Sequence, residues 1–195
     1  MNTLPDIRYN KINKNPTIDS DKSLYELPFY KDEEYFSGLD NYTTFIHAVE
    51  RMIRSSNQYS KYIKYLKETI GMTYCQVLSN ITDDDASIEM HHGPILTLCD
   101  YVCVVTDALL SDNKKINTFI VADILLREHF ENNIQIVMLS KTVHEQVHEY
   151  NIFLNSKHAF GNLNAFIKKY RNGIFPDLVD KINHYIDLSM DKDSF

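Results

Sequence analysis

Segments with the hydrophobic periodicity of an amphipathic helix follow one another along most of this chain, and they constrain its fold more than any other feature. In the first of them, Phe45, Val49 and Ile53 recur at the spacing that places side chains on one face of a helix. Similar spacing, with capping and turn residues between the segments, predicts helices over about 42–55, 60–69, 97–110, 117–129, 140–150, 162–171 and 176–190. The sequence therefore predicts a mostly helical protein.

Strand-like segments are short and few. Residues 73–78 and 87–92 flank the acidic run Asp83-Asp84-Asp85, and we expect the two segments to pair as a hairpin. The acidic run lacks the ligand spacing of a calcium loop, so we interpret it as a solvated turn. A further short strand is predicted over 133–139. With the helices, these strands predict an α+β fold that is mostly helical.

The charge balance argues against a protein whose main task is to hold nucleic acid. The chain has 20 Lys and Arg against 27 Asp and Glu, a formal net charge of −7 at pH 7. Proteins that bind phosphates strongly are usually basic. A local basic face stays open, because basic residues gather on two neighbouring predicted helices, at Arg51, Arg54, Lys61, Lys64 and Lys67. The solvent-exposed side of an ordinary helix gives the same pattern.

The sequence favours a cytoplasmic protein without a membrane partner. No segment has the roughly 18–20 continuous apolar residues that a bilayer span needs, and the polar N-terminus lacks the apolar run of a signal peptide. The three cysteines, Cys75, Cys99 and Cys103, contain no C-x-x-C pair. We interpret them as buried small apolar residues in a reducing compartment.

Two groups stand out among the eight histidines. His91 and His92 end a predicted strand, and adjacent imidazoles are poor core residues because each ring carries two polar nitrogens that need partners. His144 and His148 are four residues apart on a predicted helix, so their Cβ atoms lie about 5–6 Å apart on one face. That spacing suits two nitrogens binding one transition-metal ion, although many helices carry such a pair without a metal. We interpret the other four as surface or hydrogen-bonded side chains: His47, His129, His158 and His184.

The order of these groups resembles the HNH (ββα-metal, His-Me finger) endonuclease family, and the DNase colicins most closely. The matching residues are Ile-Glu-Met-His-His-Gly-Pro at 88–94, Asn133-Ile134 at the start of a strand, and His144-x-x-x-His148 on a helix. The resemblance implies a small ββα-metal core formed by 73–96 and 132–150.

The implied domain organisation is a single globular domain over 25–195. Where the family usually has a short loop, this chain has a two-helix insertion over 97–131, which is expected to fold away from the core, and C-terminal helices follow over 162–190. Residues 1–24 are rich in Asn, Lys, Asp and Pro, and we expect an extended or flexible arm there.

The same resemblance implies a role for each residue of the site. The implied ligands of one divalent ion, which could be Zn, Mg, Mn or Ni, are His91, His144 and His148. His92 would be the general base that activates water, and Glu89 a carboxylate that fixes the tautomer of a histidine. Asn133 would hold the loop or orient His92, and Lys141 would lie near the phosphate.

Three functions follow as hypotheses from these observations. The first is a metal-dependent endonuclease that cleaves DNA, of a virus or phage type suggested by the motif with Thr97-Leu98-x-Asp100 after it, acting in the host cytoplasm. The second is a non-catalytic, virus-encoded binding or structural protein that keeps a structural metal site and contacts a protein partner through the insertion or the N-terminal arm. The third is a helical interaction module without a metal, in which His91 and His144 lie more than about 10 Å apart.

Overall fold

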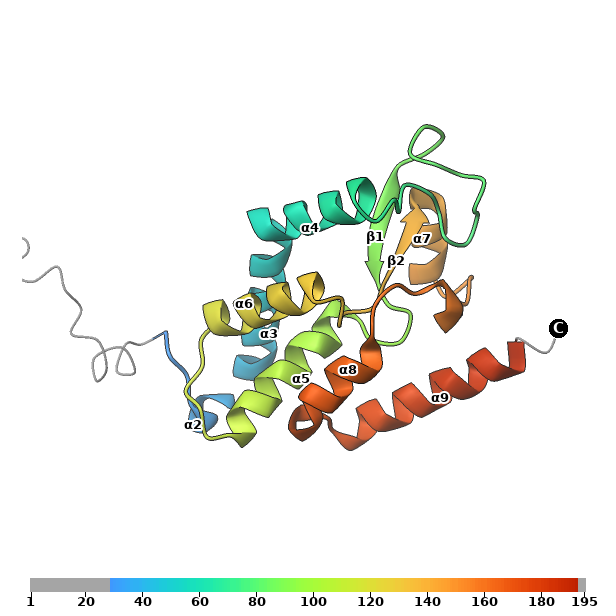
Figure 1. The fold of residues 1–195 in the computed structure, drawn as a ribbon. Coiled ribbons are helices and arrows are strands. Elements are labelled where there is room, and N and C mark those ends of the chain that lie inside the picture. The colour runs from blue at the N-terminus through green and yellow to red at the C-terminus, as the bar shows by residue number, and fades with distance from the viewer. Residues whose placement is uncertain (1–28, 193–195) are drawn as a thin grey trace, which may run out of the picture.

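Helices surround one two-stranded antiparallel sheet in the computed structural model of this protein, which describes residues 29–192 (Figure 1). The predicted α+β, mostly helical fold class is therefore confirmed. The arm predicted over 1–24 lies outside the described residues. No helix within 29–192 is both long enough and apolar enough to cross a bilayer.

The predicted helices are all present within a few residues of their expected bounds. The longer ones are α3 (Leu39–Ser55), α4 (Asn57–Glu68), α5 (Leu98–Ser111), α6 (Thr118–Phe130), α7 (Lys141–His148), α8 (Leu163–Lys169) and α9 (Pro176–Lys192). A short α2 (Glu33–Phe36) precedes them, and the single 3-10 turns are η1 (Ser156–His158) and η2 (Arg171–Gly173). Capping fixes two of the starts: Thr97 and Asp100 form a capping box before α5, and the Asn117 side chain accepts a hydrogen bond from the Ile120 amide before α6.

Helices α5 and α6 form the centre of the molecule, which contradicts the expectation that 97–131 folds away as an insertion. They pack against each other and against α3, and η2 also lies against α5 (Figure 1). Tyr101, Val105 and Leu125 have no exposed surface. The physical reason is that α5 is apolar on nearly every side, so it can be stable only with neighbours all round it.

The sheet pairs β1 (Ile88–His92) with β2 (Ile136–Ser140) in antiparallel register, with His91 opposite Val137. The hairpin predicted between 73–78 and 87–92 is wrong. The first of these segments forms a bridge between Tyr74 and Thr82 instead of a strand. It reaches β2 through Gln76, which makes two hydrogen bonds with the Met138 backbone. Strand β2 is buried throughout, so it is the element that most needs a hydrogen-bonded neighbour.

Helix α7 begins directly after β2, because Lys141 follows the last strand residue Ser140. The helix turns back over the sheet and contacts both strands. Its buried residue is Val143, and Val147 packs against the core one turn later. This anchoring positions the face of α7 that carries His144 and His148 over β1.

Candidate metal centre

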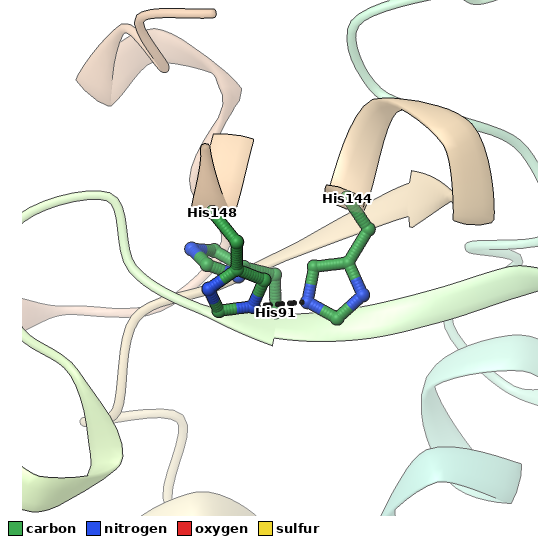
Figure 2. A group of neighbouring side chains, drawn as sticks. All are labelled: His91, His144 and His148. Carbon is green, nitrogen blue, oxygen red and sulfur yellow. Dashed lines mark hydrogen bonds between the residues drawn. The ribbon is translucent and has the colours of Figure 1, made fainter. Parts of the chain in front are cut away.

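Three imidazole rings converge where α7 crosses β1. His91 comes from the strand and His144 and His148 from the helix, and one nitrogen of each ring lies within 4.8 Å of the others (Figure 2). The ring centroids of His91 lie 5.1 Å from those of both helical histidines. The Nε2 atoms of His144 and His148 are 3.0 Å apart. The structure therefore brings together the three residues predicted as metal ligands.

Glu89 fixes the orientation of one of these rings. It lies two residues before His91, so both side chains are on the face of β1 that meets α7. Its Oε2 atom is 2.7 Å from Nδ1 of His144. Because the carboxylate accepts, Nδ1 of His144 donates, and Nε2 keeps a lone pair directed toward His148. This is the contact expected of a carboxylate that sets a histidine tautomer.

The local environment keeps His91 neutral. Burial lowers its pKa to about 4, and the nearby His144, His148 and Arg54 add to the effect. A neutral imidazole has the free lone pair that a metal requires, whereas a protonated ring repels the ion. At neutral pH this ring is therefore ready to bind a cation without first losing a proton.

The donor set fits a transition-metal ion. Zinc binds histidine nitrogen at about 2.0–2.1 Å, so two nitrogens at a tetrahedral angle lie about 3.4 Å apart. The 3.0 Å between the Nε2 atoms of His144 and His148 is close to that separation. Magnesium prefers oxygen ligands, so it suits three imidazoles least of the four predicted metals.

His92 lies on the other side of the strand, which contradicts its predicted role as general base. It is 5% exposed and stacks on Tyr59 of α4, and its Nε2 lies 2.9 Å from Nε2 of His129. His129 Nδ1 is 2.6 Å from the Leu125 carbonyl oxygen, to which it donates. Strand β1 continues through His92, so adjacent rings face opposite ways and no turn brings them together. Burial also lowers the pKa of His92 well below its usual value.

Asn133 does not orient His92. Its side-chain nitrogen donates to Glu128 at 2.7 Å and to Glu131 at 3.3 Å. Glu128 is buried and also accepts hydrogen bonds from Lys169 and Tyr170. Burial by itself raises the pKa of Glu128, but these hydrogen bonds hold it below its usual value. Asn133 thus belongs to a network that joins the end of α6 to α8.

The predicted nucleic-acid contacts lie among acidic partners. Lys67 is 2.8 Å from Asp83. Three more of the predicted contacts make longer ion pairs within their own helices: Arg54 with Glu50, Lys64 with Glu68, and Lys141 with Glu145. Arg51 and Lys61 are exposed on α3 and α4. Charges paired in this way offer little to a phosphate backbone, so the geometry gives no support to a nucleic-acid surface.

Two residues near the centre are not predicted by the sequence patterns above. A Cβ atom on Gly93 would lie 3.0 Å from Nε2 and Cδ2 of His91, so this glycine leaves room for the ring. Its position directly after the histidine pair is a usable signal, although we interpreted it as the end of a strand. His129 was interpreted as a scattered histidine, and nothing local in the sequence marks it as the partner of His92.

Comparison with known proteins identifies the chain. Its residues 3–194 match the family model described as Bacteriophage G278-like virion protein. No match was found among curated proteins or solved structures. The match covers nearly the whole chain, whereas the HNH resemblance rested on two short motifs, so the assignment to the HNH endonucleases, and with it the nuclease terms, is wrong. The chain belongs to the Bacteriophage G278-like virion protein family.

Proposed function

We propose that this chain is a non-catalytic structural component of the phage particle, and that its three histidines hold one divalent transition-metal ion, preferably zinc, that cross-links β1 to α7. The observation that carries the metal site is the convergence of His91, His144 and His148 within 4.8 Å from two separate elements. The virion family supports the structural role, and it favours the particle over the free host cytoplasm as the place of action.

The positions of the remaining polar groups favour a structural ion over a catalytic one. Metal-assisted hydrolysis needs a base within hydrogen-bond reach of the attacking water. His92, the residue considered for that task, is buried on the opposite face of β1 and paired with His129. Glu89 is bonded to His144, where it serves the ligand geometry.

An ion would add stability where the protein fold supplies little. Helix α7 has eight residues and one buried residue, Val143. An isolated helix of that length is unstable in water, so its position depends on contacts with the sheet. An ion that binds the folded state alone adds about 2.7 kcal/mol at a free concentration of 100 times its Kd. The cross-link is therefore expected to hold α7 on the sheet in the particle.

Metal content and thermal stability of the purified chain test the site. Elemental analysis is expected to give one zinc per chain, and chelation with EDTA is expected to lower Tm. His144→Ala should lose the metal and the effect of chelation, whereas His184→Ala, at an exposed histidine of α9, should keep both. Equal metal content in the two variants would overturn the metal site.

Two further measurements test the non-catalytic and particle roles. Plasmid DNA incubated with the protein and Zn²⁺, Mg²⁺, Mn²⁺ or Ni²⁺ is expected to be cleaved no faster than with His92→Ala. Quantitative mass spectrometry of purified particles is expected to find the chain at a fixed copy number that survives washing with high salt. Metal-dependent cleavage by wild type, or loss of the chain on washing, would contradict the proposal.

A further inference from the structure

The solvent-facing side of the three-histidine cluster offers a bound ion fewer ligands than it needs. The described residues supply three nitrogen donors there, and structural zinc sites are almost always four-coordinate. His148 is exposed and His144 is partly exposed, so the cluster opens to solvent on the α7 side. Glu89 is already bonded to His144. The fourth position is therefore open to a group from outside the described residues.

Arg54 adds positive charge beside this open position. It stands in the last turn of α3, and Ser56 connects that helix to α4, whose Tyr59 stacks on His92, the neighbour of His91. The Arg54 charge is close enough to act on the His91 ring, after burial and the two other histidines. Its side chain is 55% exposed and lines an open hollow with Arg51 on the surface of α3.

The charges of the site are not balanced when an ion is bound. The three imidazoles contribute no charge, so a divalent ion is offset by Glu89 alone, and Arg54 adds a further positive charge. Glu50 approaches Arg54 at 4.0 Å, but it also lies 3.1 Å from His47. A cation next to a divalent ion is unfavourable unless an anion lies between them. A carboxylate suits this place, because it ligates zinc and forms charge-assisted hydrogen bonds with arginine.

We propose that the open coordination position of the ion, together with Arg54, binds a carboxylate side chain of a neighbouring virion protein. The inference rests on the proposed function, because it requires the ion held by His91, His144 and His148. In this arrangement one carboxylate oxygen ligates the ion and the other accepts from the Arg54 guanidinium. The metal centre then joins two proteins of the particle as well as two elements of this chain.

The surroundings favour a single protein carboxylate over a nucleic-acid phosphate. A nucleic acid presents a run of phosphates, which needs several unpaired cations in a row. Here Lys64, Lys67 and Lys141 each have an acidic partner. The chain as a whole carries a net charge of −7, which repels a polyanion. One ion and one arginine match one acidic side chain.

Cobalt substitution provides the test. Co²⁺ replaces zinc in the full-length chain, and its visible spectrum reports the coordination of the ion while acetate is added as a carboxylate probe. Acetate is expected to change the spectrum of wild type with saturation, and about tenfold more acetate is expected to be needed in Arg54→Gln, which loses a charge-assisted hydrogen bond. Arg51→Gln, one turn earlier on the same helix, is expected to behave as wild type.

The outcomes separate the two proposals. If the chain gives no Co²⁺ spectrum that depends on His144, the metal site itself fails. If the spectrum forms but acetate leaves it unchanged, or acts equally on wild type and Arg54→Gln, the metal site stands and the carboxylate site is overturned. If dimethyl phosphate saturates the site at lower concentration than acetate does, the partner is a phosphodiester and the proposal is equally overturned.

Discussion

Two histidines that are adjacent in the sequence lie on opposite faces of strand β1. His91 faces α7 and the metal cluster, whereas His92 is buried against Tyr59 and His129. The sequence identified His91, His144 and His148 as a group from residue type and helical spacing. It did not predict that His92 is buried, because we expected a turn at Gly93-Pro94 to bring both rings into one cleft. Strand pairing through His92 depends on β2, which lies far along the chain.

At the residue scale, Gly93→Ala tests whether the space beside His91 matters for metal binding. The added methyl group would lie 3.0 Å from the His91 ring, so the ring must turn away from its partners. Residues that orient a ligand typically change metal affinity by about 10–100-fold, and we expect a loss of that size. Competition with a chromophoric chelator measures it. Gly38→Ala, where the nearest atom is 3.8 Å away, should bind zinc as wild type does; equal affinities for all three proteins would contradict the role of Gly93.

At the element scale, local patterns predicted the helices well and the pairing of elements poorly. Periodicity and caps such as Asn117 depend on neighbours within one or two turns, so they are readable from sequence. The partner of β1 is separated from it by α5 and α6, and the HNH resemblance led us to treat those helices as an insertion. The apolar surface all round α5 indicated instead that it is the centre of the core.

The contact between η2 and α5 gives a prediction for Gly173. A Cβ atom there would lie 2.0 Å from the Val104 carbonyl oxygen and 2.6 Å from the Ala108 amide nitrogen. Backbone atoms cannot move aside as a flexible side chain can, so Gly173→Ala should lower the free energy of unfolding by about 1–3 kcal/mol. Urea denaturation measures the change. Gly38→Ala should lose less than about 1 kcal/mol; a Gly173→Ala variant as stable as wild type would show that η2 is not packed against α5 as described.

On the scale of the whole molecule, the acidic charge and the pairing of basic residues agree with the virion family. The net charge of −7 by itself argues against a protein that binds nucleic acid strongly. Ion pairs such as Lys67 with Asp83 extend that argument to the basic helices. Composition thus gave a better indication of the class of protein than two short motifs did, because charge is a property of the whole chain.

Stability of the metal-free protein is expected to fall as the pH is lowered from 6.5 toward 4. In the unfolded chain His129 binds a proton near pH 6.5, whereas burial lowers its pKa to about 4 in the folded protein. The unfolded state therefore binds more protons in this window, and the contribution of His129, roughly 3 kcal/mol above pH 6.5, is lost as the pH falls. His91 acts in the same direction. Urea denaturation in EDTA at several pH values measures the decline, and the exposed-site variant His184→Gln should retain it. A constant free energy of unfolding from pH 7 to 4.5 would contradict the buried histidine pair.

Anomalous X-ray scattering at the zinc edge, from crystals of the full chain, tests the metal site most directly. One peak is expected between His91, His144 and His148, with a nitrogen of each ring about 2.0–2.1 Å away, and the His92 ring still against His129. Crystals grown with zinc that show no peak among these three rings, or a peak that His92 ligates, would contradict the account.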